Sequence, residues 1–324
     1  MTDIVVVSNS RAEWSPLSSV IAALPGARVV RLPEPAQIAN PDQVMALALP
    51  WFTTELAGAS IIILLGDRYE TLAAALAATF LRIPIAHIHG GETTTGAFDD
   101  AFRHSITHLA EQSGGLHFAA TEKAAHRITE LTNGSQRVHL VGAPGLDGIP
   151  EGSARRERNT VVVSFHPETM AEDFGVGVCV QMLMGLRALR NDIRIVFTGV
   201  NKDPGHEKIE VLIDEFCQAH PSTRIVATLP RNAYISLLQE AKLLIGNTSS
   251  IPIEASWVGI PAVLVGTRQR GREVGDNIFQ NDNDIRAAIS SALLSFGGES
   301  NPPYRGGNVG VRIAEIVREF VREV

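Results

Sequence analysis

The sequence predicts an α/β fold with parallel sheets. Short, nearly continuous runs of Val, Ile and Leu alternate with amphipathic stretches, and clusters of polar residues follow directly after the apolar runs. Strands of a parallel sheet are buried on both faces and therefore read as unbroken apolar runs. Regular alternation of such strands with helices is typical of doubly wound sheets. We expect two Rossmann-like halves whose strand ends face a central cleft.

The expected elements follow one another in order along the chain, strands as short apolar runs and helices as amphipathic stretches. The strands lie at residues 5–7, 61–65, 85–88, 138–141, 161–163, 193–197, 243–245 and 262–265. The helices lie at residues 72–80, 98–109, 121–131, 172–189, 206–219, 232–241 and 285–294, and a last one lies at about 311–324.

The segment 142–158 is the expected linker, because it is rich in Gly and Pro and ends in a charged run. It divides the chain into a first domain, residues 1–147, and a second domain, residues 148–324. Two domains also agree with a length of 324 residues, at roughly 150 residues a domain.

Composition excludes several classes of protein. Lys and Arg number 28 against 35 Asp and Glu, a net charge of −7, whereas a broad nucleic-acid surface needs an excess of cations. Cys179 and Cys217 form no disulfide or zinc pattern. The longest apolar runs, such as 61–65, are far shorter than the roughly 20 residues of a membrane span. With no signal peptide at the N-terminus, we expect a cytoplasmic protein without nucleic-acid or membrane partners.

The polar clusters at the strand ends indicate a ligand site, because ligands of such sheets bind at the carboxyl ends of the strands. Residues 247–250 open a helix, where a phosphate or a simple N-cap is expected. Arg268 and its neighbours Arg270 and Arg272 could clamp a diphosphate or lie in an exposed loop. Glu254 could bind ribose hydroxyls or lie on a solvated helix face.

A second group of residues suits acid–base chemistry, since it combines carboxylates with histidines. One of Asp99 and Asp100 could instead begin a helix. The histidines lack a third partner for a metal site, and the chain has no GxGxxG and no P-loop, so we expect neither metal nor cofactor. The group comprises Asp67, Glu92, Asp99 and Asp100 with His87, His89, His104 and His166.

Several motifs together resemble the hydrolysing UDP-N-acetylglucosamine 2-epimerases of the sialic and legionaminic acid pathways. In the first half these are Gly-Asp-Arg-Tyr-Glu at 66–70, His-Ile-His-Gly-Gly-Glu at 87–92, the stretch 96–107 and Val-Gly-Ala-Pro-Gly-Leu-Asp at 141–147. In the second half they are Phe-His-Pro at 165–167, Asn-Lys-Asp-Pro-Gly at 201–205, Asn-Thr-Ser at 247–249 and the stretch 266–272.

The resemblance implies a GT-B fold, with the sugar bound by the first domain, UDP bound by the second, and a C-terminal helix that packs back on the first. It implies cleavage of a UDP-2-acetamido sugar, either UDP-GlcNAc or a UDP-2,4-diacetamido-2,4,6-trideoxyhexose, to UDP and the free 2-epimer. The route passes through a glycal-like intermediate. A protonated His166 would lie near the leaving diphosphate.

The resemblance also implies the roles of single residues. The catalytic set would be Asp67, His87, His89, Glu92, Asp99 and His166. The substrate-binding set would be Arg11, Glu13, Arg68, Arg103, His104, Asn201, Asp203, Thr248, Ser249, Ser250, Glu254 and Arg268.

Some alternatives stay open. Non-hydrolysing relatives place a catalytic Glu where this chain has His89, so either His89 or Glu92 carries the proton. The region 32–58 is a compact substitute for a longer segment that shapes the sugar pocket and the subunit contacts. A non-catalytic nucleotide-sugar binder and a GT-B glycosyltransferase are the competing functions. The family expectation is a homo-oligomer, a dimer or a tetramer.

Overall fold

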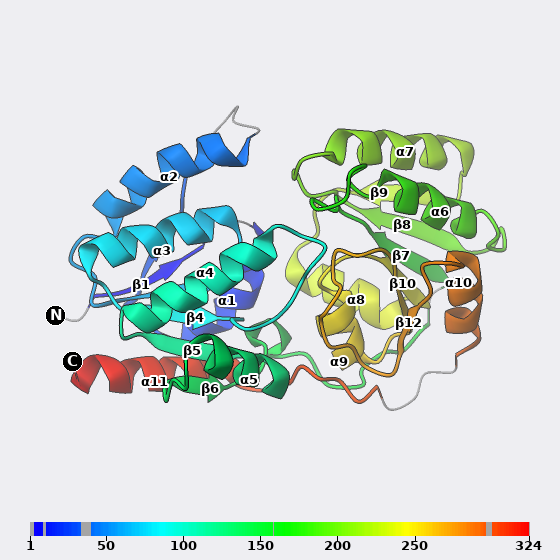
Figure 1. Cartoon of the computed structure of the whole chain (residues 1–324). Helices are drawn as coiled ribbons and strands as arrows, with labels where there is room; N and C mark the ends of the chain where they lie inside the picture. The colour runs from blue at the N-terminus through cyan, green and yellow to red at the C-terminus, as the bar shows by residue number, and fades with distance from the viewer. Residues whose placement is uncertain (1–2, 9–10, 34–39, 158, 296–299, 324) are drawn as a thin grey trace. The chain divides into compact units, whose positions relative to one another are not determined.

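The chain forms two α/β units (Figure 1). The computed structural model describes residues 3–8, 11–33, 40–157, 159–295 and 300–323, without the side chains of residues 11–13. Each unit contains a sheet of six strands, and the paired strands are parallel throughout. The predicted α/β class with two Rossmann-like domains is confirmed. Unit 1 comprises Met1–Glu92, Asp99–Gly148 and Arg305–Val324, and unit 2 comprises Thr93–Phe98 and Ile149–Tyr304.

The sheet of unit 1 has the strand order β2-β1-β3-β4-β5-β6. Alternate side chains of its strands enter two separate cores, as the pleat of a strand requires. Val5 and Val7 pack on one face, and Val6 packs on the other. The strands are β1 (Ile4–Val7), β2 (Arg28–Val30), β3 (Ile61–Leu65), β4 (Ile85–Ile88), β5 (Leu116–Ala119) and β6 (Val138–Leu140).

Helices cover both faces of this sheet (Figure 1). One core contains side chains of α2, α3 and α4, and the other contains side chains of α1 and α11. The helices are α1 (Arg11–Ala23), α2 (Pro41–Glu55), α3 (Tyr69–Leu81), α4 (Asp99–Gln112), α5 (Glu122–Leu131), the short η1 (Pro144–Leu146) and α11 (Val309–Glu323).

The C-terminal helix α11 is part of unit 1. Its residues Val309, Ile313 and Val317 are fully buried in the core that it shares with α1. Its first turn is capped from a distance, because both oxygens of Asp147 accept backbone N–H groups, of Val309 at 2.9 Å and of Gly310 at 2.8 Å. A carboxylate at this position also offsets the helix dipole.

The sheet of unit 2 has the order β12-β11-β10-β7-β8-β9. One face is covered by α6, α7 and α10 in a single core. The strands are β7 (Thr160–Ser164), β8 (Arg194–Thr198), β9 (Thr223–Val226), β10 (Leu243–Gly246), β11 (Ala262–Leu264) and β12 (Ile278–Gln280). The helices are α6 (Val176–Leu186), α7 (His206–Ala219), α8 (Arg231–Glu240), the π-helical turn η2 (Ile251–Ala255), α9 (Ser256–Val258) and α10 (Ile285–Leu294).

The apolar runs did not predict the strands β2, β5, β9 and β12 or the helices α1 and α2, and the reasons differ. The strand β5 is buried along its length, but His117 interrupts its apolar run. The strand β9 lies at the edge of its sheet and is largely accessible, so it lacks the continuous apolar run of a central strand. The strands β2 and β12 have only three residues each. The helix α2 occupies most of the region 32–58 and has Pro41 at its first position, where proline is favoured.

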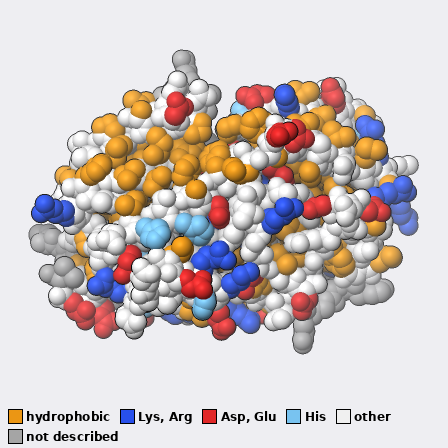
Figure 2. Space-filling view, viewed as in Figure 1, with side chains coloured by type: hydrophobic (Ala, Val, Ile, Leu, Met, Phe, Trp, Pro, Cys, Tyr) orange, Lys and Arg blue, Asp and Glu red, His pale blue; other side chains and the backbone are white. Residues whose placement is uncertain are grey.

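Apolar side chains gather on the surface of unit 1 over α2 and α3 (Figure 2). Leu47 of α2 is 56% exposed and Phe80 of α3 is 69% exposed. Among the described residues, no helix has the length and apolarity to cross a membrane.

Candidate functional site

Each sheet has one point at which the chain reverses its direction of winding. In unit 1 the chain passes from β1 to β2 on one side and returns to β3 on the other side of β1. In unit 2 it passes from β7 to β8 and β9, and returns to β10 on the other side of β7. Ligands of open α/β sheets bind at the carboxyl ends of the strands beside such a point. In unit 1 the predicted site residues follow β1 and β3, lie in or after the neighbouring β4, or lie on α4, and in unit 2 they follow β7, β8, β10 and β11.

The buried guanidinium of Arg103 organises the site of unit 1. Its side chain is 1% exposed and it makes an ion pair with Asp67, which follows β3. It also donates to Asp100 Oδ1 at 3.1 Å and to the Glu92 carbonyl at 2.9 Å. A residue with so little exposed surface cannot be an open ligand-binding group, so this geometry favours a positioning role for Arg103 over the substrate contact predicted for it.

His89 and Glu92 form a hydrogen-bonded pair in the turn after β4. The Nδ1 atom of His89 lies 2.5 Å from Glu92 Oε1, and their side chains are 10% and 2% exposed. An ionised carboxylate only accepts hydrogen bonds, so the proton of a neutral ring lies on Nδ1 and leaves Nε2 as the basic atom. Glu92 therefore orients the ring and fixes its tautomer, as carboxylates do in catalytic dyads.

The backbone of this turn is constrained. His89 has φ +63°, a left-handed conformation that costs a non-glycine residue free energy and often marks functional sites. Gly91 has φ +75°, and a Cβ there would lie 2.2 Å from the Ala124 carbonyl oxygen in α5. Only glycine allows the turn to approach α5 so closely.

His87 differs from its neighbours because it is fully buried. Its Nε2 donates to the Gly66 carbonyl at 2.9 Å, and Thr107 Oγ1 lies 3.3 Å from Nδ1. Burial lowers the pKa of His87 to about 3, so its ring is neutral at pH 7. These contacts join β4 to the β3–α3 turn that carries Asp67, which favours a positioning role over the predicted catalytic one.

The other predicted residues of unit 1 lie nearby on α1, α3 and α4. Asp99 is half-buried in the first turn of α4, and His104 Nε2 lies 3.6 Å from Asp100 Oδ2. Arg68 precedes α3 and makes an ion pair with Glu70 at 3.1 Å. The side chains of Arg11 and Glu13, in the first turn of α1, lie outside the described part of the chain.

In unit 2, Asn247 joins the ends of β10 and β7. Its side-chain amide accepts from the His166 backbone N–H and donates to the His166 carbonyl, both at 2.8 Å. Asn247 is fully buried, so this reciprocal pair fixes the strand ends at the point where the winding reverses. The prediction treated Asn247 as part of a helix-start motif and missed this role.

The ring of His166 is neutral, which corrects the prediction of a protonated His166. Burial, and secondarily the positive charge of Arg268, lowers its pKa to about 3. The Asn201 backbone N–H donates to its Nδ1 at 3.2 Å, so the ring proton lies on Nε2. The Nε2 atom of His166 lies 3.5 Å from Ser164 Oγ, so the ring can donate one hydrogen bond there or to a ligand, and it adds no positive charge.

Glu168 is a buried carboxylate that the prediction did not select. It is 2% exposed and accepts from the backbone N–H of Thr267 at 2.8 Å and from the Thr267 hydroxyl at 2.9 Å. The backbone N–H of Arg268 is 3.4 Å away. Glu168 thus fixes the loop after β11 that presents Arg268. The position of Glu168, one residue after the Phe-His-Pro motif, is the only sequence signal for it.

Arg268 and Asp203 lie close together, with Nη2 4.0 Å from Oδ2 and side chains that are 15% and 8% exposed. Asn201 and Asp203 follow β8, and Arg268 follows β11. The carboxylate of Asp203 and the neutral ring of His166 are therefore both near this cation.

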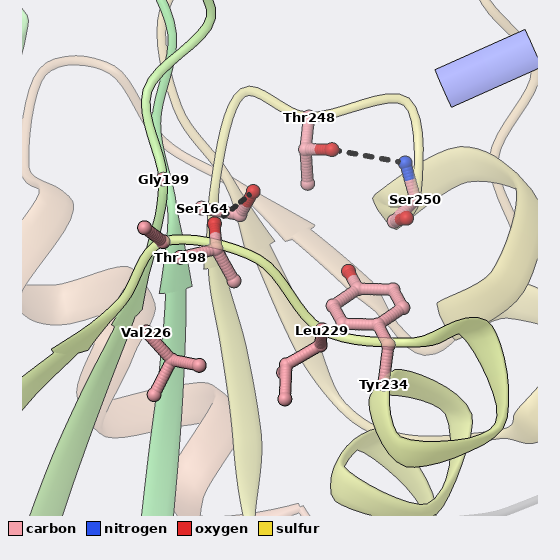
Figure 3. A pocket seen from close by; sticks show the side chains of 9 residues that line it. Ser164, Thr198, Gly199, Val226, Leu229, Tyr234, Thr248 and Ser250 are labelled. Carbon is pink, nitrogen blue, oxygen red and sulfur yellow. Dashed lines mark hydrogen bonds between the residues drawn. The ribbon is translucent and has the colours of Figure 1, made fainter. Parts of the chain in front are cut away.

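A small pocket of about 180 Å³ opens at the ends of β7, β8, β9 and β10 (Figure 3). The hydroxyls of Thr198 and Ser164 are hydrogen-bonded at 2.9 Å on one side. The ring of Tyr234 lies on another side with its hydroxyl toward Ser250, and burial raises the pKa of Tyr234. Apolar, hydroxyl and backbone groups together suit a flat polar ring such as a nucleobase. The lining residues are Ser164, Thr198, Gly199, Val226, Ala227, Leu229, Tyr234, Thr248 and Ser250.

The loop 247–250 leads into η2, as the prediction of a helix start requires. Thr248 is buried and its hydroxyl accepts from the Ser250 N–H at 3.3 Å, whereas Ser249 is exposed. Glu254 lies near enough to Tyr234 for its charge to affect that side chain. Thr248 and Ser250 line the pocket, and Glu254 lies at its Tyr234 side.

Comparisons with known proteins place the chain in one family. Residues 41–318 match the family model described as UDP-N-acetylglucosamine 2-epimerase. The chain is 33% identical over 71% of its length to the UDP-N,N′-diacetylbacillosamine 2-epimerase (hydrolyzing) of Legionella pneumophila, and the match spans 62% of that relative. It is 29% identical over 79% of its length to the GDP/UDP-N,N′-diacetylbacillosamine 2-epimerase (hydrolyzing) of Campylobacter jejuni, 71% of which is covered.

Solved structures agree on the fold. The Methanocaldococcus jannaschii UDP-GlcNAc 2-epimerase, solved in complex with UDP-GlcNAc and UDP, has a TM-score of 0.78 at 16% identity. The match covers 98% of this chain and 100% of that one. The likeness confirms the predicted GT-B class. The chain therefore belongs to the UDP-N-acetylglucosamine 2-epimerase family.

Proposed function

We propose that this chain is a hydrolysing 2-epimerase, which cleaves a UDP-2-acetamido sugar to UDP and the free 2-epimer. The observation that carries the proposal is the Arg103 network. One buried guanidinium bonds the carboxylate of Asp67 and the backbone carbonyl of Glu92, and Glu92 in turn holds His89. Asp67 and His89, the candidate acid–base groups that follow the neighbouring strands β3 and β4, are thus held by one rigid network. Proton transfer to or from a carbon atom requires groups that are positioned in this way.

The first step removes the C2 proton of the sugar while the C1–O bond to UDP breaks. We assign the proton transfer to His89 Nε2, because Glu92 occupies Nδ1 and fixes the tautomer of the ring. The electron pair of the C2–H bond forms the C1=C2 double bond of a glycal, and UDP leaves with the electrons of the C1–O bond.

The second step adds water across the glycal. A proton returns to C2 from the opposite face, the hydroxyl of the water molecule bonds to C1, and the remaining proton of the water passes to the carboxylate that supplied the first. We propose that Asp99 donates the proton to C2, since it begins α4 beside the His89 turn. Asp67 is paired with the buried Arg103, which favours its charged form, so we assign it to positioning. The product is the free 2-epimer, which re-forms no bond to UDP.

Unit 2 supplies the groups for UDP. The pocket beside Tyr234 takes the uracil, and Glu254 takes the ribose. Thr248, Ser250 and Arg268 bind the diphosphate, where Arg268 can bind two oxygens at once. Because His166 is neutral, it contributes a single hydrogen bond from Nε2, and the positive charge for the departing UDP comes from Arg268.

The hydrolysing relatives support UDP-N,N′-diacetylbacillosamine or UDP-GlcNAc as the sugar, and a place in sialic or legionaminic acid synthesis. The exposed apolar surface over α2 and α3 supports the predicted homo-oligomer. Analytical sedimentation measures the oligomeric state of the wild-type protein and of the double variant Leu47→Asp, Phe80→Asp, which should be a monomer. A wild-type monomer would remove the oligomer from the proposal.

The test is proton NMR in deuterated water with each UDP-sugar. We expect UDP release together with a free 2-epimer that carries deuterium at C2. The Asp99→Asn variant should lower turnover at least ~100-fold, the lower scale for acid–base groups, while Asp214→Asn, an exposed aspartate in α7, serves as the matched control. Binding of the UDP-sugar without turnover would refute the epimerase and favour a nucleotide-sugar binder. Unchanged turnover would remove Asp99 from the mechanism.

A further inference from the structure

An aromatic ring and a cation are stacked in unit 1, outside the acid–base group. The guanidinium carbon of Arg31 lies 3.8 Å from the centroid of the Trp14 ring. The indole is 41% exposed, and Arg31 is exposed as well. Among the described residues Arg31 has no hydrogen-bond partner, so the stack holds its plane while the N–H groups at its edge stay available.

The stack lies at the same edge of the sheet as Asp67. Trp14 is in the first turns of α1, directly after β1, and Arg31 is the residue that follows β2. The strands end level, because the Ser8 N–H donates to the Val30 carbonyl at 3.0 Å and Val6 of β1 pairs with Ile63 of β3. The end of β2 is two strands from the end of β3, or about 10 Å at the spacing of a sheet.

About 10 Å, twice the spacing of neighbouring strands, is also the distance between groups that contact a substituted pyranose from opposite sides, one at C1 and C2 and the other at a substituent on C4. Asp67 and the His89–Glu92 pair follow β3 and β4 and address C1 and C2 of the substrate. From the ends of β1 and β2 the stack can reach the side of the pyranose ring that lies away from C1 and C2, which is the side that carries the C4 substituent. The region 32–58, which we predicted to replace a longer pocket-forming segment, begins directly after Arg31.

The chemistry of the stack fits an acetamido group better than a hydroxyl. The carbonyl oxygen of an acetamido group accepts from a guanidinium N–H, and its methyl group packs on an indole face. A C4 hydroxyl has no methyl group to pack on the indole. An exposed aromatic surface held beside a cation with free donors would complement both parts of the amide.

We propose that Trp14 and Arg31 form a specificity subsite for a second acetamido group, at C4 of the UDP-sugar. This inference rests on the proposed function and deepens it, because it selects the 2,4-diacetamido-2,4,6-trideoxyhexose over GlcNAc. Arg31 binds the acetamido oxygen, and Trp14 positions Arg31 and covers the methyl group.

The test compares kcat/KM for UDP-N,N′-diacetylbacillosamine and for UDP-GlcNAc in wild type, Arg31→Gln, Arg31→Lys and Trp14→Leu. Loss of a hydrogen bond that a site is built to make changes discrimination strongly. We expect Arg31→Gln to lower the ratio of the two constants at least ~10-fold. The ratio for Arg31→Lys should lie between those of wild type and Arg31→Gln, because lysine keeps the charge but lacks the planar guanidinium. Arg322→Gln, an exposed arginine of α11, is the matched control.

A binding measurement separates this inference from the proposed function. Calorimetry on the His89→Gln background, which removes the assigned base, gives Kd for UDP, UDP-GlcNAc and the diacetamido sugar with turnover suppressed. We expect Arg31→Gln to weaken only the preference for the diacetamido sugar. If wild type hydrolyses neither sugar but keeps this binding preference, the epimerase fails and the subsite stands. An equal loss for both sugars and for UDP, or no change in their ratio, overturns the subsite.

Discussion

Replacing Glu168 with glutamine should loosen the loop that presents Arg268. The two oxygens of Glu168 accept from the N–H and the O–H of Thr267 at 2.8 and 2.9 Å. A hydrogen bond to a charged group contributes about 1.5–3 kcal/mol and a neutral one about 0.5–1.5 kcal/mol. The Glu168→Gln variant keeps the shape but not the charge. It should therefore lose about 1 kcal/mol per bond, or about 2 kcal/mol in the free energy of unfolding.

The same change should weaken UDP binding, because the Arg268 backbone N–H lies 3.4 Å from the same carboxylate. We expect an increase in the Kd for UDP of about tenfold, which corresponds to roughly 1.4 kcal/mol. Urea denaturation followed by fluorescence measures the stability, and calorimetric titration measures the affinity. Glu172→Gln is the matched control, since Glu172 is exposed four residues away.

The reasoning is refuted if Glu168→Gln has both the stability and the UDP affinity of the Glu172→Gln control. Loss of stability with unchanged UDP affinity would mean that the loop holds Arg268 without help from Glu168. A Gly266→Ala variant provides a second approach to the same contact. Gly266 has φ +71°, and a Cβ there would lie 2.0 Å from Glu168 Oε1, so this variant should show the same pair of losses.

Three further predictions concern the pair in unit 1, the buried histidines and the last helix. His89→Gln should lower turnover at least ~100-fold. Glu92→Gln should lower it less, because this variant keeps the basic Nε2 atom of His89. Equal losses in the two variants would indicate that Glu92 itself carries the proton. The pKa of His166 is lowered to about 3 in the folded chain from an ordinary 6.5. The unfolded chain therefore binds more protons, and stability should fall as the pH falls from 6.5 to 3. Urea denaturation between these pH values measures the free energy of unfolding. This free energy should depend less on pH in His166→Gln than in wild type, whereas the exposed His126→Gln should behave like wild type. Ile313→Ala should lower the free energy of unfolding by about 2–5 kcal/mol, whereas Val311→Ala, at a site that is 46% exposed, should have little effect.

Most central strands could be predicted from the sequence because burial on both faces favours apolar residues. The exception is β5, which is buried along its length but contains His117. The runs 61–65 and 85–88 coincide with β3 and β4. Edge strands carry no such pattern, and β6, with no residue fully buried, was predicted only because it happens to contain apolar residues.

Roles within the site were harder to predict than their positions. From the sequence alone, Arg103 is a cation on an amphipathic helix. Only the fold shows that its guanidinium is buried and paired with Asp67 and Asp100. His87 and His89 are two residues apart, yet His87 is fully buried and the side chain of His89 keeps 10% of its surface exposed. A sequence cannot distinguish these cases, because burial of a polar group depends on partners that are distant along the chain.

The division of the chain between the units has a consequence for its synthesis. Unit 1 needs residues 305–324 to complete its second core, but unit 2 lies almost entirely within Ile149–Tyr304. On the ribosome, the N-terminal sheet emerges first and must wait for α11 to cover Val6, Ile61 and Ile63. The later-made half can therefore finish folding before the earlier one, with the part of the first sheet's apolar face that α1 leaves uncovered exposed to chaperones until α11 arrives.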